Sequence, residues 1–264
     1  MTPVAAPRPT ATATYPDLAG KVAVVTGGSR GIGAAAALAL AANGVSVVVV
    51  GRDQAAIDNS VGAVRGMGAQ ALGVIADCTV DAELDALQQA VSAAFGRVDI
   101  LAAFAGGNGM PVATDKEHGA HWREVVETDL TSTFLTVSAF LPGMLECTSG
   151  VIITMASSAA RQAAKSSAAY AAAKAGIIAL TRHLAGEFGN AGIRVNCIAP
   201  SAVENDRMRS WMTGEQRIAL GGSFPLGRIG QPEDVAAATL FLASDASSWI
   251  TGVTLDVAGG KVML

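Results

Sequence analysis

A tyrosine and a lysine, Tyr170 and Lys174, stand four positions apart in the segment YAAAK, and Ser157 precedes them at the end of an apolar run. Residues at i and i+4 share one helix face, so the Lys174 ammonium can lie beside the Tyr170 phenol. A free phenol ionises at a pH of about 10, and a neighbouring positive charge favours the phenolate. The pair can therefore exchange a proton near neutral pH, with the Ser157 hydroxyl holding a substrate carbonyl. Taken alone, YAAAK also suits an alanine-rich helix with one buried aromatic side chain and one solvated lysine.

The composition limits the protein to a few classes. The chain has 264 residues, 51% of them hydrophobic and 15% charged, with a net charge of −4. The length suits one large α/β domain or two small ones with a sizeable core. The absence of any lysine or arginine run argues against a nucleic acid or an anionic membrane as partner. No apolar segment approaches the roughly 18–20 residues that span a bilayer.

The chain ends and the cysteines indicate a cytoplasmic enzyme. Residues 1–17 are rich in Pro, Thr and Ala and lack the apolar core of a signal peptide, so we expect a flexible tail. Three widely spaced cysteines suggest reduced core thiols rather than disulfides: Cys78, Cys147 and Cys197.

Short Val/Ile-rich runs alternate with longer alanine-rich stretches along the whole chain. The runs are KVAVVT, VSVVVV, ALGVIA, VDILAAFA, GVIITMA and IRVNCIA, and helices are expected at 31–43, 53–67, 81–95, about 120–145 and about 168–188. Runs that are apolar on both faces are typical of parallel strands covered by helices on each side. We therefore predict one α/β domain over 18–264, a Rossmann-type doubly wound sheet whose ligands lie beyond the carboxyl ends of the strands.

A glycine-rich loop, TGGSRGIG at 26–33, follows the first strand and opens the first helix. Glycines at such a junction allow a tight turn and let backbone N–H groups approach a pyrophosphate. A glycine-rich turn without a ligand is the alternative. The position after the first strand of a βαβ unit favours a nucleotide site.

The residues after the second strand favour NADP(H) over NAD(H). Gly51 stands where many NAD-binding folds place an acidic residue for the ribose, Arg52 follows it, and Arg30 lies in the glycine loop. Two guanidinium groups suit a 2′-phosphate better than a hydroxyl. Asp53 is the one nearby acid, and we interpret it as a helix N-cap. NAD(H) stays open as the second choice.

The glycine loop, Ser157 and YAAAK, in this order, resemble the short-chain dehydrogenase/reductase family, in particular its 3-oxoacyl-ACP reductase-like members. The resemblance covers about residues 18–260, and it implies a mainly parallel seven-stranded sheet. Ser157 lies thirteen residues before Tyr170, the separation usual in the family. By resemblance the cofactor residues are Gly27, Ser29, Arg30, Gly31, Ile32, Gly33, Arg52, Asp77, Cys78, Ala105, Gly106, Tyr170, Lys174, Pro200, Val203 and Asn205.

The resemblance also implies a reaction. Tyr170 would exchange a proton with the alcohol or ketone oxygen, while Ser157 hydrogen-bonds that oxygen. Lys174 would bind the nicotinamide ribose and favour the phenolate, and hydride would pass between the nicotinamide and the substrate carbon.

The sequence departs from the family at several positions. The Asn-Asn-Ala-Gly motif is here Ala103-Phe104-Ala105-Gly106, and the asparagine of the long central helix, fourth member of the catalytic set, is here Asp129. In the family that position supports a proton-relay water, largely through its carbonyl. Asp129 either leaves this relay intact or adds a negative charge that alters proton handling. Ser201 and Asn205 replace the usual glycine and threonine, and Asn205 can still bind a carboxamide.

Two segments are expected to enclose the substrate. Residues 206–225 resemble the family's mobile lid, where Met208, Trp211 and Met212 either form an apolar wall or pack against the sheet. The loop 106–121 forms the other wall. It contains His118 and His121, but no third ligand is evident, so no metal site is predicted.

Neither wall has an obvious charged anchor, which favours a neutral ketone or secondary alcohol, with a 3-oxoacyl thioester as a further substrate class suggested by resemblance. We therefore expect an NADP(H)-dependent oxidoreductase. The alternatives are a cofactor-binding sensor or scaffold without turnover, and a reductase acting on an imine. The family and the apolar end KVML suggest a homotetramer packed through the helices at 120–145 and 168–188.

Overall fold

The computed structural model describes residues 13–107 and 111–263, and it contains one seven-stranded sheet in the order β3-β2-β1-β4-β5-β6-β7. Every neighbouring pair of strands is parallel. The strands are β1 (Val22–Thr26), β2 (Ser46–Gly51), β3 (Ala71–Ile75), β4 (Ile100–Ala103), β5 (Gly150–Met155), β6 (Ile193–Pro200) and β7 (Thr254–Val257). The predicted doubly wound parallel sheet is confirmed.

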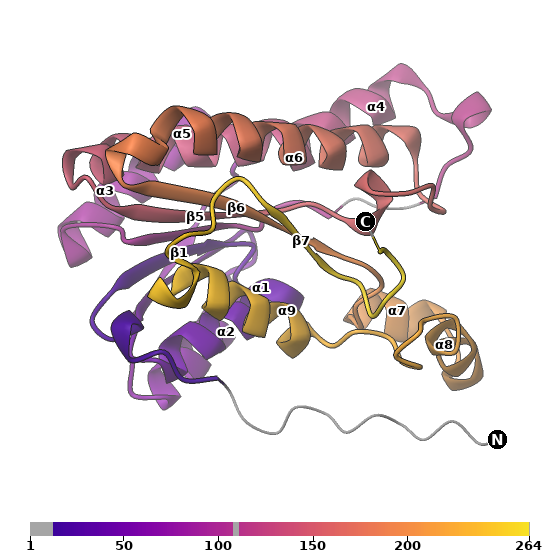
Figure 1. The fold of residues 1–264 in the computed structure, drawn as a ribbon, viewed down its shortest axis with the longest axis horizontal. Coiled ribbons are helices and arrows are strands. Elements are labelled where there is room, and N and C mark those ends of the chain that lie inside the picture. The colour runs from indigo at the N-terminus through magenta and orange to yellow at the C-terminus, as the bar shows by residue number, and fades with distance from the viewer. Residues whose placement is uncertain (1–12, 108–110, 264) are drawn as a thin grey trace.

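Helices cover both faces of this sheet (Figure 1). One layer holds α1 (Gly31–Ala42), α2 (Gln54–Gly66) and α9 (Pro232–Ala243), and the other holds α3 (Asp81–Phe95), α4 (Gly119–Val126), α5 (Ser132–Glu146) and α6 (Ala168–Phe188). Two short helices, α7 (Asp206–Trp211) and α8 (Gly214–Gly221), lie beyond one end of the sheet in the segment predicted as a lid.

Alternation within the strands explains why both faces need covering. Val47 and Val49 of β2 pack into the core beneath α1 and α9, whereas Val48 and Val50 pack into the core on the α3 and α5 side. Successive side chains of a strand point to opposite faces, and all four valines are fully buried. A sheet apolar on both faces requires two helical layers.

The long helix expected at 120–145 is interrupted. A π-helical turn, Glu127–Thr131, separates α4 from α5 and contains Asp129. Such turns are frequent at functional sites because they insert an extra residue into the helical repeat. The interruption therefore sets the direction of the Asp129 side chain.

The N-terminal segment is packed from residue 13 onward. Residues 1–12 of the predicted tail lie outside the described residues. The Tyr15 N–H donates to Asn43, and Leu18 is fully buried. Residues 13–17 therefore contact the folded domain, although the sequence assigns them to a flexible tail.

The structure tests the expectation that the three cysteines are reduced core thiols and the expectation that no segment spans a membrane. All three cysteines are free thiols; Cys78 and Cys197 are buried as predicted, but Cys147 is exposed at the end of α5, so its assignment to the core was wrong. No helix in the described part of the chain is both long and apolar enough to cross a lipid bilayer.

Candidate functional site

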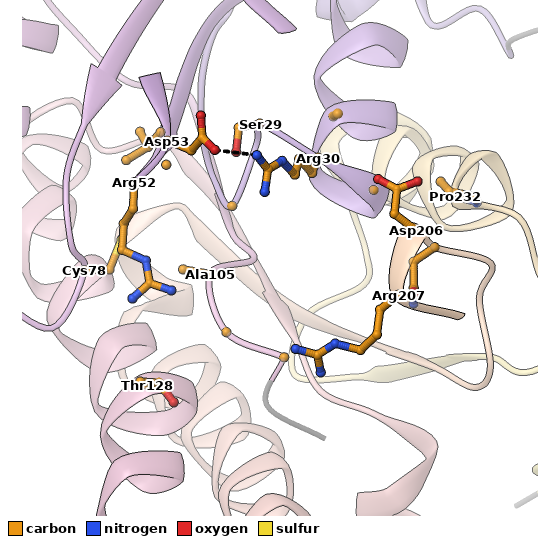
Figure 2. Close-up of a pocket in the computed structure, with 18 of the residues that line it drawn as sticks. Ser29, Arg30, Arg52, Asp53, Cys78, Ala105, Thr128, Asp206, Arg207 and Pro232 are labelled. Carbon is orange, nitrogen blue, oxygen red and sulfur yellow. Dashed lines mark hydrogen bonds and ion pairs between the residues drawn. The ribbon is translucent and has the colours of Figure 1, made fainter. Parts of the chain in front are cut away.

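A cavity of about 1150 Å³ lies beyond the carboxyl ends of the central strands (Figure 2). Its walls come from the loops that follow β1, β2, β3 and β4, from the π-helical turn, and from the start of the lid. The predicted cofactor residues that line it are Gly27, Ser29, Arg30, Gly31, Arg52, Asp77, Cys78, Ala105, Gly106 and Asn205. Parallel α/β sheets place ligands at this edge, and the volume is large enough for a dinucleotide.

The glycine loop folds back closely on itself. A Cβ atom at Gly33 would lie 2.1 Å from the backbone oxygen of Gly27, so no side chain fits there. Gly33 therefore shapes the loop without lining the cavity. Helix α1 begins at Gly31 with no side-chain cap, which leaves its first N–H groups available to an anion.

The loop after β4 is held by a hydroxyl instead of the asparagine that the sequence lacks. Thr26 at the end of β1 accepts hydrogen bonds from the N–H groups of Phe104 (3.0 Å) and Ala105 (3.1 Å). Phe104 itself is buried in the core. The altered motif thus keeps Ala105 and Gly106 at the cavity wall.

Two ion pairs mark the end of the cavity next to β2. Arg30 pairs with Asp53, and Arg52 lies 3.5 Å from Asp77. Asp53 also caps α2 by accepting from the Ala56 N–H, as predicted. This backbone hydrogen bond, with the nearby guanidinium group of Arg30, holds the pKa of the Asp53 carboxyl below its ordinary value. Both arginines therefore face the cavity beside carboxylates.

Asp77 is fixed by the turn that follows it. Its carboxylate accepts from the backbone N–H (3.0 Å) and the hydroxyl (2.7 Å) of Thr79. These bonds, more than the charge of Arg52, lower the pKa of Asp77. Beside it, burial raises the pKa of the Cys78 thiol, so Cys78 meets the cavity as a neutral group.

The predicted proton couple, Tyr170 and Lys174, does not line this cavity but lies next to its wall, because Asp129 contacts both Lys174 and the lining residue Gly107. Lys174 is 2% exposed, and its Nζ lies 2.8 Å from Oδ1 of Asp129 and 3.1 Å from the Met155 oxygen, to which it donates. The same Nζ is 5.6 Å from the centre of the Tyr170 ring. Helix α6 thus places the ammonium beside the phenol, as the i, i+4 spacing predicts.

The remaining catalytic candidate, Ser157, lies at the end of β5. Its Oγ accepts from the Ala159 N–H at 3.2 Å, which starts a short 3₁₀ turn, Ser158–Ala160. Helix α6 is capped at its N-terminus by Ser167, whose hydroxyl accepts from the Tyr170 N–H. The predicted site residues that do not line the large cavity are Ile32, Gly33, Asp129, Ser157, Tyr170, Lys174, Pro200 and Val203.

Sequence reasoning missed a carboxylate that holds the start of α6. Glu117, with a side chain 3% exposed, accepts from the N–H groups of Ala168 (3.0 Å) and Ala169 (3.3 Å) at the start of α6. Its other neighbour is His121, whose Nδ1 lies 2.9 Å away. Fifty-one residues separate Glu117 from Ala168, so no local pattern predicts this contact. His118, the second predicted histidine, caps α4.

The segment 206–225 adds two guanidinium groups that the sequence did not suggest, those of Arg207 and Arg209. Arg207 lines the cavity, and Figure 2 shows it directed inward from the lid, across from Arg52. Its guanidinium group lies 5.7 Å from the Trp211 ring. Trp211 is 62% exposed, so it does not pack into the core. Asn205 caps α7 through the Met208 N–H, which occupies the side-chain oxygen expected to bind a carboxamide.

Within residues 13–107 and 111–263, no cluster of three or more His, Cys, Asp or Glu side chains is arranged to hold a metal ion. His118 and His121 are used as a helix cap and as the partner of Glu117.

Comparison with known proteins identifies the family. The family model described as enoyl-(acyl carrier protein) reductase matches residues 27–261. The chain belongs to the short-chain dehydrogenase/reductase family. It is 38% identical over 249 residues to 3-oxoacyl-[acyl-carrier-protein] reductase FabG of Escherichia coli, covering 93% of this chain and 98% of that protein. Hydride transfer between a nicotinamide cofactor and a ketone or alcohol is consistent with this family.

Two further relatives carry other names. The chain is 38% identical to cis-4-hydroxycyclohexanecarboxylate dehydrogenase of Sinomonas cyclohexanicum, covering 91% of this chain and 96% of that one. The solved structure of 7α-hydroxysteroid dehydrogenase with NADH and 7-oxo glycochenodeoxycholic acid superposes with a TM-score of 0.88 at 37% identity, covering 95% of this chain and 97% of that chain. Relatives of similar identity thus have different substrates in their names.

Proposed function

We propose that the protein is an NADP(H)-dependent carbonyl reductase or alcohol dehydrogenase in which Tyr170 is the general acid and base. The observation that carries the proposal is the buried Lys174 ammonium, which is held 5.6 Å from the Tyr170 ring by Asp129 and Met155. A fixed positive charge beside a phenol favours loss of its proton. Tyr170 then donates a proton to a ketone oxygen during reduction, or accepts one from an alcohol during oxidation.

Other residues of the chain bind the substrate and the cofactor. Ser157 hydrogen-bonds the substrate oxygen, and Lys174 holds the nicotinamide ribose. When bound, the nicotinamide supplies or accepts the hydride. The uncapped start of α1 and the close-packed glycine loop suit the diphosphate, which supports a dinucleotide in this cavity.

The preference for NADP(H) rests on the two arginines next to β2. Arg30 and Arg52 line the cavity where the ribose edge would lie, and both are largely exposed and able to bind a 2′-phosphate. Asp53 and Asp77 partly neutralise them, so a 2′-phosphate has to compete with these carboxylates. One relative was solved with NADH, and NAD(H) is the alternative cofactor for this chain.

The names of the relatives support the proposed substrate class. A 3-oxoacyl-[acyl-carrier-protein], a 7α-hydroxysteroid and cis-4-hydroxycyclohexanecarboxylate appear in the relatives' names. We propose that the substrate is a ketone or secondary alcohol and that the enzyme is a homotetramer in the cytoplasm. Gel filtration at the monomer mass would reject the tetramer.

Oxidation of NADPH against a panel of ketones, 3-oxoacyl thioesters and imines tests the function. We expect turnover with at least one ketone or thioester. Turnover with imines alone would show that the substrate is an imine instead of a ketone or secondary alcohol. Tight NADPH binding with no turnover across the panel would instead favour a sensor or scaffold.

A further inference from the structure

One carboxylate oxygen joins the proton couple to the cofactor cavity. Oδ1 of Asp129 lies 2.8 Å from the Lys174 Nζ and accepts from the Gly107 N–H, also at 2.8 Å. Asp129 is fully buried, and the Lys174 side chain is 3% exposed. The two side chains therefore form a buried ion pair that water screens little.

The loop on the other side of this oxygen is built around it. Gly106 has φ +124°, and a Cβ atom there would lie 2.4 Å from the Asp129 Oδ1. Only glycine tolerates both the conformation and the close approach. Ala105, Gly106 and Gly107 line the cavity, so Asp129 fixes the cofactor loop and the lysine at the same time.

The backbone carbonyl of Asp129 is engaged elsewhere. It accepts from the Thr133 hydroxyl at 2.8 Å, within the helix. A lysine ammonium has three N–H donors. Asp129 and the Met155 oxygen each receive one, which leaves one donor for a cofactor hydroxyl.

We propose that Asp129 is a positioning residue whose carboxylate offsets the charge of Lys174 and thereby shifts proton exchange at Tyr170 to higher pH. The proposal rests on the proposed function, in which Tyr170 is the proton donor. An asparagine in place of Asp129 keeps the shape and an oxygen acceptor but carries no charge. The positive charge of Lys174 would then no longer be offset by a neighbouring carboxylate, so it would favour the phenolate of Tyr170 at a lower pH.

Among the described residues, no other charged group on the elements packed around Tyr170 and Lys174 is placed to offset the Lys174 charge as Asp129 does. Strand β5 and the Ser158–Ala160 turn carry no titratable side chain, and burial raises the pKa of Cys197 on β6, so that thiol is neutral near pH 7. Arg194 on β6 donates to Ser247. The titratable groups on α4 and the π-helical turn are His121, which pairs with Glu117, and the exposed Arg123, Glu124 and Glu127.

The composition allows the phenol to be titrated directly. The chain has two tyrosines, Tyr15 and Tyr170, so Tyr15→Phe leaves Tyr170 as the single phenol. In this background the near-ultraviolet absorbance of the phenolate is followed against pH, with and without Asp129→Asn. We expect Asp129→Asn to lower the titration midpoint of Tyr170. Thr133→Val, which removes the bond to the carbonyl but keeps the carboxylate, should leave the midpoint unchanged.

The pH–rate profile gives the matching functional readout. For alcohol oxidation, the rising limb of kcat/KM against pH should shift to lower pH in Asp129→Asn by the same amount. Superimposable titrations and profiles for Asp129→Asn and the parent would overturn the proposal. If Asp129→Asn does not fold, Asp129→Ser is measured in its place with the same two criteria. A parent enzyme without turnover would reject the proposed function, while the phenol titration would still test Asp129.

Discussion

The site uses ion pairs in opposite ways at two places: a buried end, at Lys174 and Asp129 beside Tyr170, and an exposed end, at the arginines next to β2. At the proton end, the side chains of Lys174 and Asp129 are 3% and 0% exposed. At the end next to β2, those of Arg30 and Asp53 are 65% and 49% exposed. Exposed pairs contribute about 0–1 kcal/mol and are screened by salt, whereas a buried pair depends strongly on both partners. One end is thus fixed by the fold, and the other can exchange its partners for a ligand.

The largest expected effect is on stability at the buried end. Lys174→Met leaves the Asp129 carboxylate buried without its ammonium partner, and we expect the free energy of unfolding to fall by about 3–5 kcal/mol. Adding Asp129→Asn removes the stranded charge and should restore most of this loss, although the double variant stays inactive. Urea unfolding of the parent, the single variant and the double variant measures both changes. A double variant no more stable than Lys174→Met would contradict the comparison.

A smaller effect is expected on cofactor choice at the exposed end. Arg52→Ala removes a charge-assisted contact to a 2′-phosphate, worth about 1.5–3 kcal/mol, so NADPH affinity should fall by about 10- to 100-fold while NADH affinity hardly changes. Arg65→Ala is the control, since Arg65 donates to the Ala71 oxygen at 2.9 Å and does not line the cavity. Equal losses for NADH and NADPH on titration would show that Arg52 does not distinguish the cofactors.

The smallest effect concerns the stability of the exposed pair. Arg30→Ala should leave the free energy of unfolding almost unchanged, because water and salt already weaken its pairing with Asp53. The affinity of the parent for NADPH should nevertheless fall as salt is raised, since the arginines that bind phosphate are screened. A large loss of stability in Arg30→Ala, measured by urea unfolding, would mean that the two ends do not differ.

The sequence predicted the strands and helices, and it predicted the residue contacts that depend on neighbours close in the chain. The buried valine runs gave the sheet, the i, i+4 spacing placed Lys174 beside Tyr170, and Asp53 caps α2 as its position suggests. These features depend on the periodicity of strands and helices or on neighbours within a few residues. Local patterns were therefore sufficient for the fold and for part of the site.

Contacts between distant segments could not be predicted in this way. Two contacts of Asp129, with Gly107 and with Lys174, cross between elements, and a π-helical turn that no periodicity signals sets its direction. Glu117 reaches the start of α6, and Arg207 lines the cavity from the segment 206–225, far along the chain from the glycine loop. Each of these contacts depends on tertiary packing. Residue type alone therefore could not decide whether Asp129 leaves the proton relay intact or adds a negative charge beside Lys174.

The most direct test of the account compares Tyr170→Phe with the parent. The substitution removes the hydroxyl that exchanges the proton and leaves the ring, Lys174 and the cofactor cavity in place. We predict that turnover of the best carbonyl substrate is abolished, while NADPH binding measured by fluorescence stays close to that of the parent. Turnover at the parental rate in Tyr170→Phe would contradict the assignment of this tyrosine as the proton donor, and with it the proposed mechanism.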